Sequence, residues 1–244
     1  MLILLFLVGL WAGAQNALAG GGSFITLAAL VAAGLDPKLA NITSTMALFP
    51  GQITTGWAGR SLVSGAERLS FRSLALISFM GGIGGAFLLI ATPGMVFAAM
   101  VPWLVLAATA LFAWSSFGPR PKVAAAPPPA WVTVLTQSAI GLYGGFFGGG
   151  AGIMTMASLA LARLPVRNAA GTKNVLVALA NLSAAVVFAL SGAFAWREAL
   201  IIGAGAMLGG YLGAHALKKL PEMVLKVGVV VIGAGLTAGL FLRG

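Results

Sequence analysis

Ten apolar stretches follow one another along the chain, separated by charged residues, Pro and Gly. Most of them can cross the hydrocarbon core of a membrane, about 30 Å thick, as a single α-helix. The stretches at 22–35 and 151–163 are too short, because thirteen helical residues span only about 20 Å. The pattern therefore predicts an all-α integral membrane protein with about 8–10 membrane segments, in which each short stretch is one arm of a hairpin. The other apolar stretches are 1–19, 41–59, 71–91, 94–117, 131–148, 173–194, 199–217 and 223–242.

A glycine cluster precedes each short stretch, and the two clusters belong to an internal repeat. The segment Leu18-Ala-Gly-Gly-Gly-Ser-Phe24 recurs 129 residues later as Phe147-Gly-Gly-Gly-Ala-Gly-Ile153. Nine of the 24 residues at 20–43 are identical to their partners at 149–172. The chain is therefore two related membrane repeats, 1–117 and 131–244. The Pro-rich stretch 118–130, with its helix-breaking residues, is the linker between them.

Composition supports a lipid environment. Of the 244 residues, 60% are hydrophobic and only 7% are charged, whereas a soluble domain carries about 25% charged residues. The net charge of +10 would suit a nucleic-acid partner in a soluble protein. Here the Lys and Arg lie between apolar stretches, which is the pattern of positive-inside flanking charge. We therefore expect the lipid bilayer as a partner and no nucleic acid.

The distribution of basic residues predicts the topology. If residues 1–35 enter the membrane and return, the fourteen Lys and Arg divide eleven to three between its two sides. If those residues cross once, the division is seven to seven, and the positive-inside rule favours the first arrangement. Each half then has an odd number of crossing units, so the repeats are inverted, with periplasmic termini and a cytoplasmic linker. The three periplasmic residues are Lys38, Arg197 and Arg243; the eleven cytoplasmic ones are Arg60, Arg68, Arg72, Arg120, Lys122, Arg163, Arg167, Lys173, Lys218, Lys219 and Lys226.

The two glycine breaks are candidate anion sites. A break frees backbone N–H groups, and the next half-helix directs its positive dipole end into the gap. Glycine also lets a ligand approach the backbone closely. Close helix packing through small residues is the alternative, but paired broken helices at equivalent positions favour a transporter's substrate site. We expect the clusters to meet near the middle of the membrane. The candidate residues are Gly20, Gly21, Gly22 and Ser23 in the first break and Gly149, Gly150, Ala151 and Gly152 in the second.

Polar side chains near the breaks could complete the site. By the apolar pattern, Thr43 and Thr172 open equivalent helices, where each could bind substrate or cap its helix. Lys173, the repeat partner of Ser44, could attract an anion; a snorkelling positive-inside charge is the favoured alternative. The candidate residues here are Thr43, Ser44, Thr172, Lys173 and Asn174, with Gln15, Asn16, Thr26 and Thr155 as secondary candidates.

Other chemistry finds little support in the sequence. The four acids, Asp36, Glu67, Glu198 and Glu222, lie at the ends of apolar stretches, so a carboxylate proton relay or sodium site is poorly supported. One histidine and no cysteine provide no metal-ligand set. We therefore expect no cofactor and no enzymatic activity. A passive anion channel and a non-transporting membrane assembly or accessory protein stay open as alternatives.

The paired arrangement resembles the sulfite exporter TauE/SafE family. The similarity rests on Gly20-Gly-Gly-Ser23 with Pro37-Lys-Leu-Ala40-Asn-Ile-Thr43, and on Gly148-Gly-Gly-Ala-Gly152 with Leu164-Pro-Val-Arg-Asn-Ala-Ala-Gly-Thr172-Lys173. It covers essentially the whole chain. The resemblance implies a multi-pass secondary transporter of the bacterial inner membrane. It further implies a small anionic substrate such as sulfite, a sulfonate or sulfoacetate, with export as the expected direction. The oligomeric state is open, with a homodimer as one alternative.

Reporter fusions test the predicted topology. A fusion at Gly244 should report a periplasmic location and a fusion near Ala125 a cytoplasmic one, because this arrangement puts eleven of the fourteen basic residues inside. A cytoplasmic C-terminus would contradict the hairpins and require parallel halves.

Overall fold

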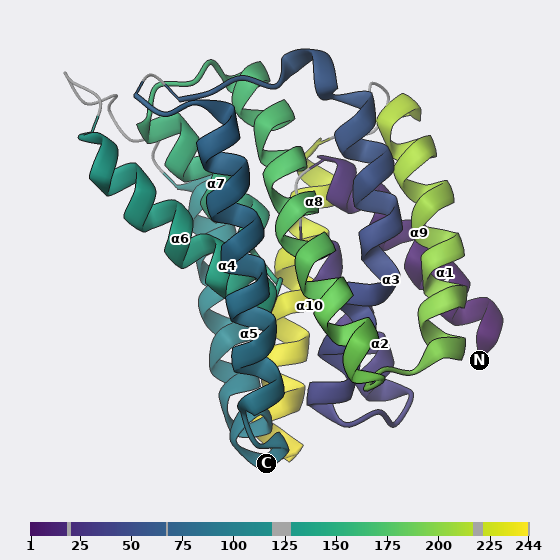
Figure 1. Ribbon diagram of the computed structural model, residues 1–244. Coiled ribbons are helices and arrows are strands. Elements are labelled where there is room, and N and C mark those ends of the chain that lie inside the picture. Colours follow the sequence, from purple (N-terminus) through teal and green to yellow (C-terminus); the bar gives the residue numbers. More distant parts are fainter. Residues whose placement is uncertain (19–20, 67, 119–127, 217–221, 244) are drawn as a thin grey trace.

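The computed structural model describes residues 1–18, 21–66, 68–118, 128–216 and 222–243. Their regular structure is helical, so the predicted all-α fold is confirmed (Figure 1). Three of the described helices are long and apolar enough to cross a membrane: Phe71–Ala91, Gly94–Trp114 and Arg167–Ser191. The helices are α1 (Leu2–Leu18), α2 (Gly22–Ala32), α3 (Pro37–Ala58), α4 (Phe71–Ala91), α5 (Gly94–Phe117), α6 (Ala130–Phe146), α7 (Ala151–Leu161), α8 (Val166–Ser191), α9 (Trp196–Ala216) and α10 (Glu222–Arg243), with a 3₁₀ turn, η1 (Arg60–Leu62).

The short helices α2 and α7 are equivalent in the two halves. Each has 11 residues, and each begins directly after a glycine in the left-handed conformation, Gly21 with φ 85° and Gly150 with φ 83°. This backbone conformation is costly for any residue with a Cβ. The glycine clusters are therefore true helix breaks, each ending one helix and starting a shorter one.

Helices α3 and α8 begin earlier than the apolar pattern predicts, at Pro37 and Val166 instead of 41 and 173. Pro37 occupies the first helical position, and Asp36 accepts hydrogen bonds from the N–H groups of Lys38 and Leu39 as the N-cap. The helices thus start in a polar segment that the apolar pattern does not include. The prediction that Thr43 and Thr172 open these helices is wrong, and neither residue caps its helix.

The halves pack against each other in a reciprocal pattern. Helix α1 packs on α9, and its counterpart α6 packs on α4, the counterpart of α9. In the same way α3 packs on α9 and α8 on α4, while the counterparts α3 and α8, and α5 and α10, contact each other. A two-fold relation between the halves would give this pattern; the inverted orientation stays a prediction.

Glycine pairs bring two of these helix pairs into close contact. In α1 and α9, a Cβ on any glycine of the facing Gly-xxx-Gly motifs would overlap a backbone carbonyl oxygen of the opposite helix. In the α4–α6 pair, a Cβ on Gly85 would overlap the carbonyl oxygen of Leu142, and one on Gly145 would overlap that of Gly82. Small residues permit this approach in membranes, where the hydrophobic effect does not drive helices together. The motifs are 9–13, 205–209, 81–85 and 141–145.

Two basic residues, Lys38 and Arg197, lie at the same end of the helix bundle (Figure 1). In Figure 1 both termini lie toward the lower end of the bundle, and α3 ends at the upper end, where η1 follows it. Helices α3 and α9 begin at the lower end, which puts Lys38 and Arg197 of their first turns there. Lys38 donates hydrogen bonds to the carbonyl oxygens of Ile90 and Thr92 at the end of α4. Which end faces the periplasm stays a prediction.

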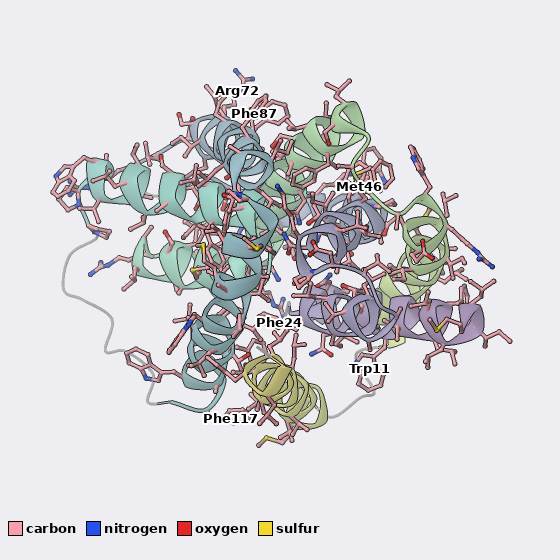
Figure 2. The ribbon with its side chains drawn as sticks, turned by 90° about the horizontal axis from the view of Figure 1, so that it is seen from below. Trp11, Phe24, Met46, Arg72, Phe87 and Phe117 are labelled. Atoms are coloured by element: carbon pink, nitrogen blue, oxygen red, sulfur yellow. The ribbon has the colours of Figure 1, made fainter. Side chains whose placement is uncertain are left out.

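Large apolar side chains lie on both the inside and the outside of the bundle. Figure 2 shows Phe24 directed into the middle, while Trp11 and Phe117 lie at the periphery. Phe24 is 1% exposed, against 44% for Trp11 and 48% for Phe117. An apolar exterior is the expected surface of a protein solvated by lipid.

A methyl group at a close glycine contact tests this packing. Gly85→Ala should lower the free energy of unfolding by about 1–3 kcal/mol, because α4 and α6 must separate to accommodate it. Gly235→Ala in α10 is the matched control, since no atom lies within 4 Å of the added Cβ. Thermal unfolding in detergent measures both variants. Equal stability of the two would contradict the glycine-contact model.

Candidate functional site

A cavity of about 50 Å³ lies between the two helix breaks. One water molecule needs about 10–15 Å³ of such accessible volume. The cavity therefore has room for a small ion with a few waters. Its walls come from α1, α2, α3, α7, α8 and the two breaks. The lining residues are Asn16, Gly21, Ser23, Thr45, Leu48, Gln52, Thr55, Gly148, Gly150, Gly152, Lys173, Asn174, Val177 and Asn181.

Most of the lining consists of equivalent positions from the two halves. With the repeat offset of 129 residues, ten of the lining residues form five pairs. One pair is in direct contact: the side chain of Asn181 donates a 2.6 Å hydrogen bond to that of Gln52. The cavity therefore lies where the halves meet. The other pairs are Gly21 with Gly150, Ser23 with Gly152, Thr45 with Asn174, and Leu48 with Val177.

The two breaks also touch each other directly. A Cβ on Gly149 would lie 2.8 Å from ring atoms of both Phe24 and Phe147. Phe24 belongs to α2, so the half-helix of the first repeat packs on the glycine cluster of the second. From α3, Asn41 donates a 3.0 Å hydrogen bond to the carbonyl oxygen of Phe146, the last residue of α6.

Both breaks leave backbone N–H groups without a hydrogen bond in the described part of the chain, those of Gly21 and Ser23 in the first among them. In the first break, the side chain of Asn16 accepts the N–H of Gly22 at 2.9 Å. In the second, the N–H groups of Gly149, Gly150 and Gly152 make no hydrogen bond within the described part of the chain. These groups open α7, where the helix dipole adds a partial positive charge.

Lys173 lies beside these donors. Its side chain is 7% exposed and lines the cavity, and a Cβ on Gly152 would lie 3.8 Å from its Cδ. Among the described residues it has neither a hydrogen-bond partner nor an ion pair. The favoured alternative of the sequence analysis, a lysine snorkelling to the surface, is therefore wrong. A buried ammonium without a counter-ion is costly, and an anion in this cavity would offset that cost.

Several predicted residues have structural partners instead. The hydroxyl of Thr43 accepts the N–H of Ala195 at 3.1 Å. The hydroxyl of Thr172 accepts the N–H of Ser64 and donates to its carbonyl oxygen, both at 3.0 Å. Each threonine thus holds a connecting segment of the other half.

The remaining predicted residues lie near the cavity without lining it. Ser44 hydrogen-bonds Thr26, Thr155 donates to the carbonyl oxygen of Ala151, and Gln15 accepts from Trp11. Gly22, Gly149 and Ala151 belong to the breaks but are absent from the cavity wall. Gly20 lies outside the described residues.

The lining residues Thr45, Leu48, Gln52 and Thr55 on α3 are not among the residues predicted from the sequence. They recur at helical spacing on one face, as Val177 and Asn181 do on α8. The signal available was a polar position inside each apolar helix at matching repeat positions, Gln52 and Asn181. A smaller cavity of about 10 Å³ adjoins this wall, shares Val177 and Asn181, and has room for about one water.

Comparisons with known proteins agree with one another. A family model for the sulfite exporter TauE/SafE matches residues 5–240. The probable membrane transporter protein ORF9 of a Sinorhizobium species is 31% identical over 244 residues, covering 97% of this chain and 90% of the relative. A probable membrane transporter protein of Haemophilus influenzae is 29% identical, with 98% and 93% covered. The probable membrane transporter protein YfcA of Escherichia coli K12 is 26% identical, with 98% and 89% covered. No solved structure matches the chain significantly.

The two threonines should matter for stability and not for anion affinity. Thr172→Ala leaves both backbone groups of Ser64 without this partner, which should cost about 1–3 kcal/mol in the free energy of unfolding. Ser23→Ala, in the cavity wall, should instead lower the affinity for sulfite. Thermal unfolding at increasing sulfite concentration measures both quantities. Weakened sulfite binding at unchanged stability in Thr172→Ala would show that this residue is a ligand.

Proposed function

The chain belongs to the sulfite exporter TauE/SafE family, and on that premise we propose the substrate and mechanism of this membrane transporter. It is a secondary transporter that exports a small sulfur-containing or organic anion, such as sulfite, a sulfonate or sulfoacetate. It works in the bacterial inner membrane, with both termini in the periplasm. The anion sits between the two glycine breaks during transport.

The observation that carries the proposal is the buried ammonium of Lys173. Among the described lining residues of the cavity it is the one ionisable group, and the others are neutral. Unused N–H groups at the start of α7 lie beside it. An anion there would gain a charge-assisted contact with Lys173 and hydrogen bonds from the backbone.

Alternating access is supported by the position of the cavity between two related halves. Gln52 and Asn181 occupy equivalent positions and bond each other at 2.6 Å. If the halves rock about this contact, the cavity opens first to one side of the membrane and then to the other. Discontinuous helices at a repeat interface are the usual setting for such a site.

Flux measurements in proteoliposomes test the transport proposal. Sulfite uptake should saturate with concentration and be accelerated by sulfite on the opposite side, because a carrier must return before it can transport again. An ohmic current that does not saturate would identify a passive channel. The absence of both flux and sulfite binding would support an accessory protein instead.

Lys173→Gln tests the site. It should weaken sulfite binding about ten- to a hundredfold, since a hydrogen bond to a charged group contributes about 1.5–3 kcal/mol. The stability of the ligand-free protein should rise, because an uncompensated buried charge is removed. Binding is measured by sulfite-dependent thermal stabilisation.

Two further variants control for this change. Lys173→Arg should retain part of the affinity, because it keeps the charge. Lys38→Gln should leave the affinity unchanged, since Lys38 bonds the end of α4. Full sulfite binding and transport in Lys173→Gln would end the proposal that this residue holds the anion.

A further inference from the structure

The residues that the structure places around the cavity include a single positive charge, and the other described lining residues are neutral. Four lining residues carry carboxamides, three carry hydroxyls, four are glycines and two are aliphatic. Among the described lining residues, Lys173 is therefore the only full charge available to a ligand.

The other basic side chains that the structure describes are engaged or exposed elsewhere. Lys38 donates to the carbonyl oxygens of Ile90 and Thr92 at 2.9 and 2.6 Å. The guanidinium of Arg60 lies 4.4 Å from the ring centroid of Trp57 and is exposed. Arg163 and Arg167 are exposed as well. Exposed charges are screened over about 8–10 Å by physiological salt, so they contribute little inside the cavity.

Resting on the proposed anion site, we propose that the cavity selects singly charged oxyanions over doubly charged ones. A monoanion beside Lys173 forms a neutral pair. A dianion leaves one uncompensated negative charge in a buried site, and an unpaired buried charge costs several kcal/mol. Neutral carboxamides and backbone N–H groups stabilise a second charge far less than a second cation would.

The size and lining of the cavity narrow the ligand further. About 50 Å³ suits a compact ion. Leu48 and Val177 are the only aliphatic side chains among the described lining residues, so a long apolar tail has little surface to contact. Carboxamides and hydroxyls surround a ligand with hydrogen-bond donors for several oxygens. Among the proposed substrates, hydrogensulfite and short monosulfonates therefore fit better than the sulfite dianion or sulfoacetate, which carries two acidic groups.

A matched pair of probes tests the selection. Methanesulfonate and sulfate are both tetrahedral sulfur oxyanions, with one and two negative charges respectively. The purified wild-type protein should bind methanesulfonate at least about a hundredfold more tightly than sulfate, because each 1.4 kcal/mol is tenfold in affinity. Competition with sulfite uptake is the primary readout, since sulfate stabilises many proteins non-specifically.

Equal inhibition by the two probes would overturn the selection while leaving the anion site intact. If neither probe, nor sulfite itself, binds or is transported, the proposed anion site fails as well. The ratio of methanesulfonate to sulfate affinity in the wild-type protein therefore tests the charge selection without any substitution.

A second cation in the cavity should shift the preference. Gln52→Lys adds an ammonium at the interface of the halves, and its side chain can still reach Asn181. The methanesulfonate-to-sulfate preference should fall at least about tenfold. Gln52→Met is the neutral control and should weaken both anions alike, keeping the ratio. An unchanged ratio in a folded Gln52→Lys protein would contradict the charge-balance argument.

Discussion

The close glycine contacts between α1 and α9 and between α4 and α6 are the constraint on which the rest of the structure depends. Within lipid, a helix can break only where other protein covers its free backbone groups. Helices α1 and α6 both end at a glycine cluster, and each is held by a glycine-mediated contact to a long helix of the other half. These contacts bring the two breaks close together, and the cavity forms between them.

The proposed anion binding depends on the backbone N–H groups that the breaks leave without a hydrogen-bond partner. Asn16 and Asn41 satisfy one backbone group each, in the first and second break respectively. The N–H groups of Gly149, Gly150 and Gly152, around the start of α7, have no partner within the described residues. The hydrogen bonds of Asn16 and Asn41 thus stabilise the breaks while other N–H groups stay available to a ligand. These groups lie around the start of α7, where the helix dipole favours an anion.

Duplication and divergence contribute different parts of the site. The equivalent pairs, such as Gly21 with Gly150 and Gln52 with Asn181, define its position and shape. Its chemistry comes from a position where the halves differ. Ser44 hydrogen-bonds Thr26 in the first half, whereas Lys173 at the equivalent position lines the cavity. The charge therefore comes from the second half alone, so the two sides of the site differ in charge.

The sequence alone determined the helices, the repeat and the two breaks, because lipid forces each spanning segment to satisfy its own backbone hydrogen bonds. Apolar length and glycine position are then sufficient to locate the segments. Only the tertiary structure decided which side chains reach the cavity. Thr43 and Thr172 bond segments 152 and 108 residues away in sequence, and Lys173 is buried instead of snorkelling. These outcomes depend on how α3 and α8 are rotated by their packing, and local sequence patterns carry no information about partners so distant along the chain.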